Sequence, residues 1–256
     1  MTYTIVVLPD IHAPTEDRKA FAAVVDFIGE YQPDEVVMTG DLCDFPQPSR
    51  WSKGSAEEFA ETTVFDDSDY IKRKILTPLR KVYGGKIGFI EGNHDERPRV
   101  YLAKYAPALA ASVSFDVKNL LDFEGFGIKQ LPDFYRPFDR WVLCHGHKGG
   151  IRLKQKPGET ALGGAQKFME NVVHGHTHRL AALPHTYGVE GDTKLLWGME
   201  VGHLMNPKLV TYLKGGTGNW QQGFGILTKD GDHVSPHPVP IYDSRFVVDG
   251  NVYHVL

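Results

Sequence analysis

The chain has 256 residues, of which 41% are hydrophobic and 23% charged, which are ordinary proportions for a soluble protein long enough to bury a substantial core. Its net charge of -4 and isoelectric point near 6.3 exclude a general electrostatic attraction to nucleic acid or to anionic membranes. Any polyanionic ligand would therefore have to be held by a local site.

The length suits a single domain over residues 1–256, with a candidate insertion on the substrate side at about 45–70. The first apolar run, Ile5 to Leu8, is too short for a signal-peptide core, and no later run is long enough to span a bilayer. We therefore expect a cytoplasmic protein with no membrane partner. Cys43 and Cys144 provide no disulfide framework and are interpreted as small buried residues.

The first part of the chain alternates apolar runs with a helical pattern. Thr4 to Leu8 and Glu35 to Met38 are predicted strands, and apolar residues at helical spacing predict a helix between Thr15 and Tyr31. This strand, helix, strand order predicts a parallel pair. A helical pattern from Ile71 to Val82 precedes a third strand, Ile87 to Ile90.

Later segments carry weaker patterns. Residues 45 to 69 are irregular and acidic; we interpret them as the insertion beside the site, with a solvated surface loop as the alternative. Tyr101 to Ala111 is a helical patch, and Val113 to Phe134 allows no assignment. The remaining predicted elements are a helix at Glu159–Met169 and strands at Trp141–Cys144, Val172–Val173, Leu195–Trp197, Val210–Leu213, Phe224–Leu227, Phe246–Val248 and Val252–Val255, the last two joined at Asp249-Gly250-Asn251.

Polar side chains follow five of the predicted strands, where open α/β sheets place their ligands. They are Asp10, His12, Asp41, Asn93, His145, His176 and His178. Mixed nitrogen and oxygen donors suit Mn, Fe, Zn or Ni better than calcium or a thiolate zinc site. Seven donors are too many for one ion that keeps open positions, and they suit two ions that share a carboxylate and hold one hydroxide. Two divalent cations carry more positive charge than Asp10 and Asp41 neutralise, so such a site would attract phosphate.

His94 directly follows Asn93 and is therefore expected to face the substrate rather than the same ion. It is a candidate general acid for the leaving oxygen, or a donor that stabilises charge on the phosphate. Asp44 is the expected partner that orients its ring.

These motifs resemble those of calcineurin-like metallophosphoesterases. Asp10-x-His12, Gly40-Asp41-x-x-Asp44, Gly92-Asn93-His94-Asp95, a strand ending at His145, and Gly175-His176-x-His178 occur in that family's order over residues 5 to 178. The resemblance implies an α/β fold, a four-layer sandwich of two mixed β-sheets flanked by helices. It also implies that Asp10, His12 and His178 hold one ion, that Asn93, His145 and His176 hold the other, and that Asp41 bridges them.

The chain departs from the Ser/Thr protein phosphatase branch at two positions. Phe45 stands where that branch has an arginine, and Asp95 where it usually has glutamate. Arg50, Arg97 and Arg99 are candidates for the missing phosphate contact, with surface arginines as the alternative. His147 is an alternative ligand to His145, which we prefer because it lies nearer the strand end. His174, His185 and His203 have no partner by spacing.

The expected function is metal-dependent phosphoester hydrolysis at two divalent ions, most suitably manganese, by in-line attack of a bridging hydroxide. A diester leaves a poorer alkoxide and gains more from an acid such as His94, which favours a phosphodiesterase or nuclease. The alternatives are a phosphatase acting on protein or nucleotide monoesters, a single-zinc hydrolase, and a noncatalytic protein-binding scaffold. Trp51, Tyr101 and Trp220 are candidates for stacking on a base of a nucleotide or nucleic acid, with packing as the alternative. The sequence leaves the question of protein partners open.

Overall fold

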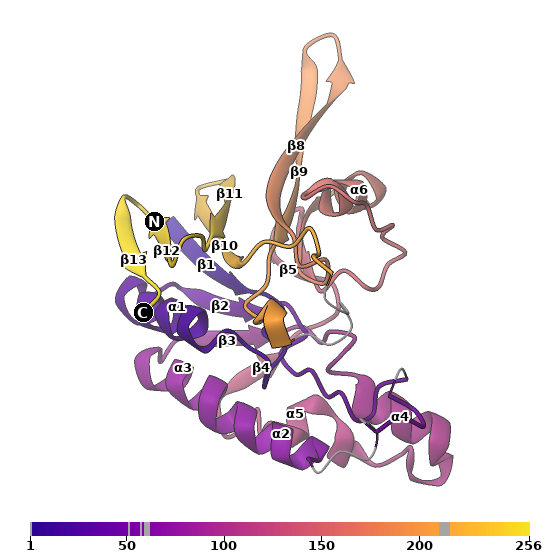
Figure 1. Ribbon diagram of the computed structural model, residues 1–256. Helices are drawn as coiled ribbons and strands as arrows, with labels where there is room; N and C mark the ends of the chain where they lie inside the picture. Colours follow the sequence, from indigo (N-terminus) through magenta and orange to yellow (C-terminus); the bar gives the residue numbers. More distant parts are fainter. Residues whose placement is uncertain (1, 51, 57, 59–61, 210–215) are drawn as a thin grey trace.

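Two mixed β-sheets form the centre of the computed structural model, which describes residues 2–50, 52–56, 58, 62–209 and 216–256 (Figure 1). The first sheet contains, in spatial order, β11 (His233–Pro240), β10 (Gly223–Asp230), β1 (Thr2–Leu8), β2 (Glu35–Met38), β3 (Lys86–Phe89) and β4 (Ile128–Gln130). The second contains β5 (Tyr135–Phe138), β6 (Trp141–Cys144), β7 (Asn171–His174), β9 (Asp192–Val201) and β8 (Leu180–Val189). A separate hairpin pairs β12 (Arg245–Val248) with β13 (Asn251–His254).

Helices lie on the outer side of each sheet (Figure 1). The first sheet is covered by α1 (Arg18–Tyr31), α2 (Val64–Ile71), the π-helical turn η1 (Lys72–Leu76) and α3 (Thr77–Val82), and the second by α6 (Glu159–Phe168). The other helical segments are α4 (Arg97–Tyr105), η2 (Pro107–Leu109), η3 (Val113–Phe115), α5 (Val117–Leu120) and η4 (Pro207–Leu209).

The burial pattern of β1 shows why these layers stack. Successive side chains of a strand point to opposite faces. Val6 and Leu8 belong to the core beneath α1 and α3, whereas Ile5 and Val7 belong to a second core shared with Leu143 and other residues of the second sheet. Both faces of β1 are therefore covered, which accounts for its unbroken apolar run. The fold is the expected α/β four-layer sandwich of two mixed sheets between helices.

The fully buried strands agree closely with the sequence prediction. β2 and β6 have the predicted bounds, and β1 begins two residues earlier. β1 and β2 pair in parallel, as the strand, helix, strand order predicts. In the unassigned segment Val113 to Phe134 the structure places η3, α5 and β4.

Several strands are longer than predicted or were not predicted. The run Leu195 to Trp197 is part of β9, which pairs with the unpredicted β8 in a long hairpin that projects from the body (Figure 1). β11 was not predicted because three of its eight residues are prolines, and proline is found in sheets only at edges or bulges. β11 lies at an edge. The predicted strand at Val210–Leu213 lies outside the described residues.

Three smaller expectations can be followed in the structure. The β12–β13 hairpin is confirmed, with Asp249 and Gly250 both at positive φ, as a two-residue type I′ turn requires. Cys43 and Cys144 are buried and unpaired. Within the part of the chain that is described, no helix combines the length and apolar character needed to cross a bilayer. The division into one domain with an insertion at 45–70 stays a prediction.

Candidate metal centre

Five loops converge at the carboxyl ends of β1, β2, β3, β6 and β7. The parallel pairing of β1, β2 and β3, and of β6 and β7, places these ends along one edge of each sheet. Because the two sheets pack face to face, the two edges meet. The loops carry all seven side chains that the sequence singles out as metal donors, namely Asp10, His12, Asp41, Asn93, His145, His176 and His178.

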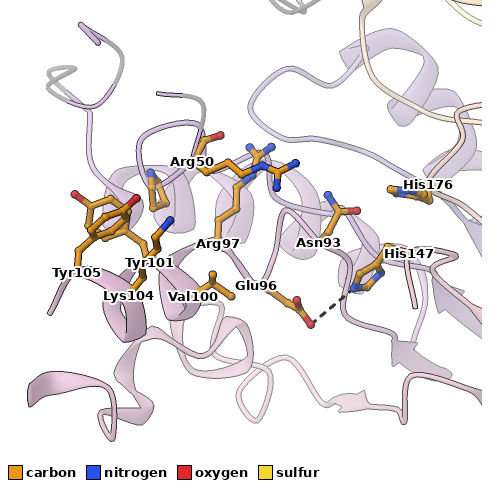
Figure 2. Close-up of a pocket in the computed structure, with 12 residues that line it drawn as sticks. Arg50, Asn93, Glu96, Arg97, Val100, Tyr101, Lys104, Tyr105, His147 and His176 are labelled. Atoms are coloured by element: carbon orange, nitrogen blue, oxygen red, sulfur yellow. Dashed lines mark ion pairs between the residues drawn. The ribbon is translucent and has the colours of Figure 1, made fainter. Parts of the chain in front are cut away.

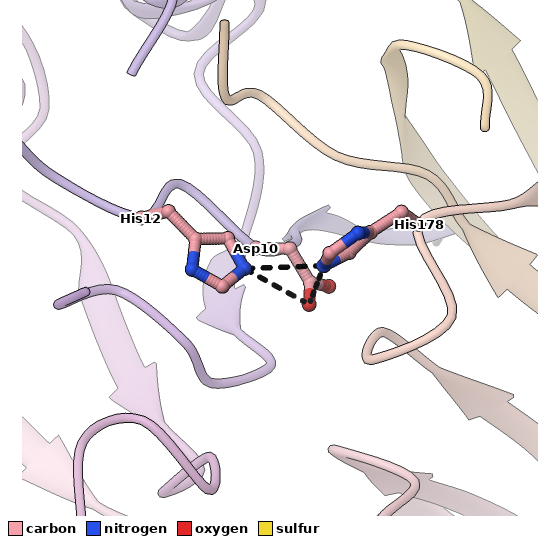
Figure 3. A group of neighbouring side chains, drawn as sticks. All are labelled: Asp10, His12 and His178. Carbon is pink, nitrogen blue, oxygen red and sulfur yellow. Dashed lines mark hydrogen bonds and ion pairs between the residues drawn. The ribbon is translucent and has the colours of Figure 1, made fainter. Parts of the chain in front are cut away.

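Asp10, His12 and His178 form a first group of donors (Figure 3). The Nε2 atoms of His12 and His178 lie 3.1 Å apart, and they are 3.9 Å and 3.5 Å from Asp10 Oδ1. All three residues are buried. Two ring nitrogens that face each other and one carboxylate oxygen, out of reach of bulk water, form a cradle suited to a cation.

A second group contains Asp41, His145 and His176, with Asn93 beside them. His145 Nε2 lies 3.3 Å from Asp41 Oδ2 and 3.1 Å from Asn93 Oδ1. The rings of His145 and His176 are 5.0 Å apart. Asp41 Oδ2 is also 3.7 Å from His12 Nε2, so one carboxylate oxygen reaches both groups.

The protonation of His145 supports the fit of a cation in the second group. Its Nδ1 is 2.8 Å from the carbonyl oxygen of Thr39, which can only accept a hydrogen bond, so Nδ1 carries a proton. In the neutral ring the Nε2 lone pair then faces oxygen atoms of Asp41 and Asn93. Lone pairs in such contact repel, so either the proton of a charged ring or a metal cation must lie between them, and a carbonyl acceptor on the other ring nitrogen is typical of metal-binding histidines.

The electrostatics of the site favour ionised carboxylates. Burial opposes their charge, yet His145 holds the pKa of Asp41 well below its usual range, and His178 lowers the pKa of Asp10. Burial likewise opposes a charged His145, but Asp41 raises its pKa to about 9. Burial and the charge of His145 lower the pKa of His176 to about 3. The site thus contains two buried carboxylates that are ionised, and nearby positive charge stabilises them.

His94 and Asp44 lie together beside the two groups. His94 Nδ1 is 2.8 Å from Asp44 Oδ1, and the same oxygen is 3.4 Å from His12 Nδ1. Arg97 Nη2 donates to His94 Nε2 at 2.9 Å, and Arg97 Nη1 donates to the Asp44 carbonyl at 2.6 Å. Because a guanidinium only donates, His94 here is the neutral Nδ1–H tautomer. This contact between Arg97 and His94 is not foreseeable from the sequence.

Phe45, the residue found where the protein phosphatase branch has its arginine, is fully buried in the core beneath the helices. Arg97 instead bonds the backbone of Asp44 and Phe45 from α4. Arg50 and Arg97 both line a cavity of about 670 Å³ (Figure 2). Arg99 is engaged with carboxylates, including Glu91 at 2.9 Å.

The other histidines lie at different distances from the centre. His147 lines the cavity, with its ring 5.1 Å from that of His145, but belongs to neither donor group. His203 is buried, 5.8 Å from the ring of His178, and His174 is buried beneath the loops. His185 stacks on Tyr187 in the projecting hairpin.

The aromatic candidates for base stacking lie in different places. Tyr101 lines the cavity with Arg50 and Arg97. Trp220 packs edge-on against His178, with ring centroids 4.7 Å apart. Trp51 lies outside the described residues.

Asp95 has a role that the sequence analysis did not assign. Its buried carboxylate accepts hydrogen bonds from the backbone N–H groups of Asp41 (2.8 Å), Cys43 (2.9 Å) and Gly92 (2.8 Å). Burial and the Asp41 carboxylate nevertheless raise the pKa of Asp95 to about 7. The residue fastens the loop after β2 to the loop after β3. A bond to backbone atoms leaves no signal in sequence spacing.

The two loops also require glycine at their closest approach. A Cβ added to Gly92 would lie 2.3 Å from the backbone nitrogen of Asp41 and 2.3 Å from its Oδ1. No real Cβ tolerates such contacts, so Gly92 allows Asp41 to reach its position.

Several known proteins are similar to this chain. The profile of the family described as calcineurin-like phosphoesterase matches residues 3–213. The chain is 54% identical to the Gene 54 protein of Mycobacterium phage D29 and 53% identical to that of phage L5, each over the full length of both chains. It is 27% identical over 121 residues, covering 42% of this chain and 32% of the relative, to a cAMP/cGMP dual specificity phosphodiesterase of Mycobacterium tuberculosis.

Solved structures with similarity include a Vps29 single mutant of Entamoeba histolytica, at 17% identity, a TM-score of 0.43, and coverage of 97% of this chain and 95% of the other. The phosphoesterase YfcE of E. coli is 17% identical, with a TM-score of 0.43 and coverage of 97% and 100%.

We predict that Asp95→Ala destabilises the protein strongly, because it strands three buried N–H donors that each cost about 1–3 kcal/mol when unpaired. The free energy of unfolding, measured by urea titration, should fall by more than about 3 kcal/mol. Asp133→Ala serves as the control: it removes an exposed pair with Lys148 and should change stability by less than about 1 kcal/mol. Similar losses in both variants would contradict the role of Asp95.

Proposed function

The chain belongs to the calcineurin-like phosphoesterase family, and we propose that it hydrolyses phosphodiesters, including those of nucleic acid, at a centre of two divalent metal ions. The position of Asp41 Oδ2, 3.7 Å from His12 Nε2 and 3.3 Å from His145 Nε2, carries this proposal. A carboxylate shared between two donor groups is the arrangement that a dinuclear site needs.

The donor groups divide the proposed ligands between the two ions. One ion would be held by the first group and the other by the second, with Asp41 shared; the residues are Asp10, His12 and His178, then Asn93, His145 and His176. The nitrogen and oxygen donors fit manganese best, with iron, zinc and nickel as alternatives. When bound, the ions supply Lewis-acid polarisation of the phosphoryl group and lower the pKa of the attacking water.

His94 is the proposed proton donor to the leaving oxygen. Asp44 holds the Nδ1 proton at 2.8 Å and thereby turns Nε2 toward the open side of the centre. As the bond between phosphorus and the leaving oxygen breaks, a proton on Nε2 passes to that oxygen. Nε2 accepts from Arg97 in the structure and so carries no proton; Arg97 must first move, and Nε2 must then take up a proton from water to form an imidazolium whose Nδ1–H is held by Asp44. An anionic phosphate competes for the guanidinium and provides that displacement.

A diester is favoured over a monoester for two reasons. The leaving alkoxide of a diester benefits from an acid such as His94. The partial relative from M. tuberculosis is described as a cyclic-nucleotide phosphodiesterase, which is consistent with diester chemistry. Phosphomonoester hydrolysis is the alternative activity of the same centre.

The reaction class is tested with metal-stripped protein to which Mn²⁺ is added. We expect turnover of bis(4-nitrophenyl) phosphate and of single-stranded DNA to appear only with metal, and to exceed that of 4-nitrophenyl phosphate. Faster turnover of the monoester would favour a phosphatase. Metal binding without turnover of any substrate would indicate a noncatalytic scaffold.

Asp41→Asn tests the shared carboxylate. We expect the metal content to fall from two equivalents to one or fewer. The diesterase kcat should fall by more than about a hundredfold, because the loss of a residue that only hydrogen-bonds to a metal ligand already costs up to about that much, and Asp41 is a proposed direct ligand. Metal analysis and rate measurements on Asp133→Asn, which alters an exposed carboxylate, provide the control. Two retained metal equivalents with full activity would refute the bridging role.

His94→Ala tests the acid. The variant should keep both metal equivalents and lose about 10²–10⁴-fold in DNA cleavage, the usual contribution of general acid catalysis. The loss with bis(4-nitrophenyl) phosphate should be smaller, because 4-nitrophenolate leaves without a proton. His185→Ala, in the projecting hairpin, is the matched control. Equal losses with both substrates would instead assign His94 to stabilising charge on the phosphate.

A further inference from the structure

One cavity of about 670 Å³ extends from the metal centre along α4, a size typical of small-ligand sites (Figure 2). At one end it is lined by Asn93, His176 and His147, and at the other by Tyr101 and Tyr105. Figure 2 shows the side chains of Arg50 and Arg97 between these two ends. The cavity therefore offers donors, cations and aromatic rings in that order.

The cavity face of α4 follows helical spacing. Arg97, Tyr101 and Tyr105 are separated by four residues each, so they lie on the same side of the helix. At 1.5 Å per residue, Tyr101 is about 6 Å and Tyr105 about 12 Å along the axis from Arg97. One helix therefore holds the arginine side chain of Arg97 and the two tyrosine rings at a fixed separation.

The charge of the lining favours an anion. Arg50, Arg97 and Lys104 line the cavity, with Glu96 as the carboxylate among the described lining residues. Glu96 lies 2.5 Å from Lys148 Nζ, which neutralises its charge. Arg97 also lies 3.6 Å from Asp44 Oδ1, so it is an ion-paired cation that an anionic ligand would share. The cationic lining is local and is compatible with the acidic composition of the whole chain.

The aromatic end exposes apolar surface in a fixed arrangement. Tyr105 is 40% exposed and Val100 51% exposed. The two tyrosine rings lie 4.7 Å apart, and the Lys53 ammonium is 4.2 Å from the Tyr105 ring and 5.1 Å from the Tyr101 ring. Tyr101 Oη also donates to Glu58 at 2.6 Å. Neither Lys53 nor Glu58 lines the cavity, so the rings are held in place without their partners filling it.

We propose that this cavity binds a nucleoside unit of the phosphodiester substrate, with the phosphate at Arg50 and Arg97 and the base against Tyr101 and Tyr105. The inference rests on the proposed hydrolase function and names its substrate class. A nucleoside phosphate combines an anion with a flat aromatic group, and bases stack on tyrosine whatever their sequence. A lipid-like diester would present a flexible chain, for which a pair of fixed rings offers no particular match.

The test uses three diesters with a common leaving group: methyl, hexyl and thymidine-5′ esters of 4-nitrophenyl phosphate, each assayed with Mn²⁺. We expect kcat/KM for the thymidine ester to exceed that for the methyl ester by about tenfold, the usual effect of one stacked base. An equal gain for the hexyl ester would overturn the nucleoside assignment in favour of an apolar chain.

Variants of Tyr105 test whether its ring causes the gain with the thymidine ester. Tyr105→Leu should reduce the ratio of thymidine to methyl kcat/KM by about tenfold, and Tyr105→Phe should retain it, because the ring and not the hydroxyl stacks. Tyr242→Leu, at an 82% exposed position, is the control and should keep the wild-type ratio. An unchanged ratio in Tyr105→Leu would overturn the subsite.

The two proposals fail in different ways. Hydrolysis of the methyl ester with no gain for thymidine rejects the subsite and leaves the hydrolase intact. If no ester is hydrolysed, the hydrolase proposal fails, and calorimetric binding of the thymidine dinucleotide to wild-type and Tyr105→Leu protein then decides the subsite. Weaker binding to the variant would support it, and equal or absent binding would reject it.

Discussion

The burial of two carboxylates at the meeting point of two sheets is the constraint on which the rest of this structure depends. Asp10 and Asp41 are almost completely excluded from water, and the histidines around them keep both ionised. Buried charges are costly unless they are paired. A protonated imidazole can donate a hydrogen bond to a carboxylate, but it cannot also bind a neighbouring ring nitrogen at the same nitrogen atom. A divalent cation can bind carboxylate oxygens and ring nitrogens at the same time. The geometry of the five loops is therefore what the proposed metal centre would need.

That assembly is maintained against local backbone strain. Five of the seven candidate ligands adopt positive φ values between 31° and 66°; they are Asp10, His12, Asp41, His176 and His178. Such conformations are unfavourable for residues other than glycine and persist where the surroundings fix them. Here neighbouring loops do so through backbone bonds: His12 donates to the Asp41 carbonyl, and Leu204 donates to that of Asp10. Asp95 adds two further bonds between the loops after β2 and β3, to Asp41 and Cys43, and one within the loop after β3, to Gly92.

How much the sequence could predict follows from the same physics. Strands buried on both faces, such as β2 and β6, are continuous apolar runs with polar residues directly after them, so their bounds and the convergence of the seven candidate side chains were foreseeable. The β8 strand was not, because it is half exposed and its pattern is broken by Pro184 and Gly188. The contact from Arg97 to His94 and the bonds of Asp95 were also hidden, since they depend on how α4 and the loops pack. Spacing predicts which side chains meet at a sheet edge, but not what fixes them there.

The residues proposed to carry out the reaction and those proposed to select the substrate lie in different parts of the structure, and Arg97 contacts both parts. The donor groups lie in the loops at the strand ends, whereas the cavity is lined chiefly by α4 and the irregular segment before α2. Arg97 begins α4 and bonds both the Asp44 carbonyl and His94 Nε2. An Nε2 atom that accepts from Arg97 cannot at the same time donate to a leaving oxygen. Under the proposed mechanism, the ligand that draws the guanidinium toward its own phosphate would therefore also free Nε2 to take up the proton that the leaving group needs, which would link occupation of the cavity to the reaction at the strand ends.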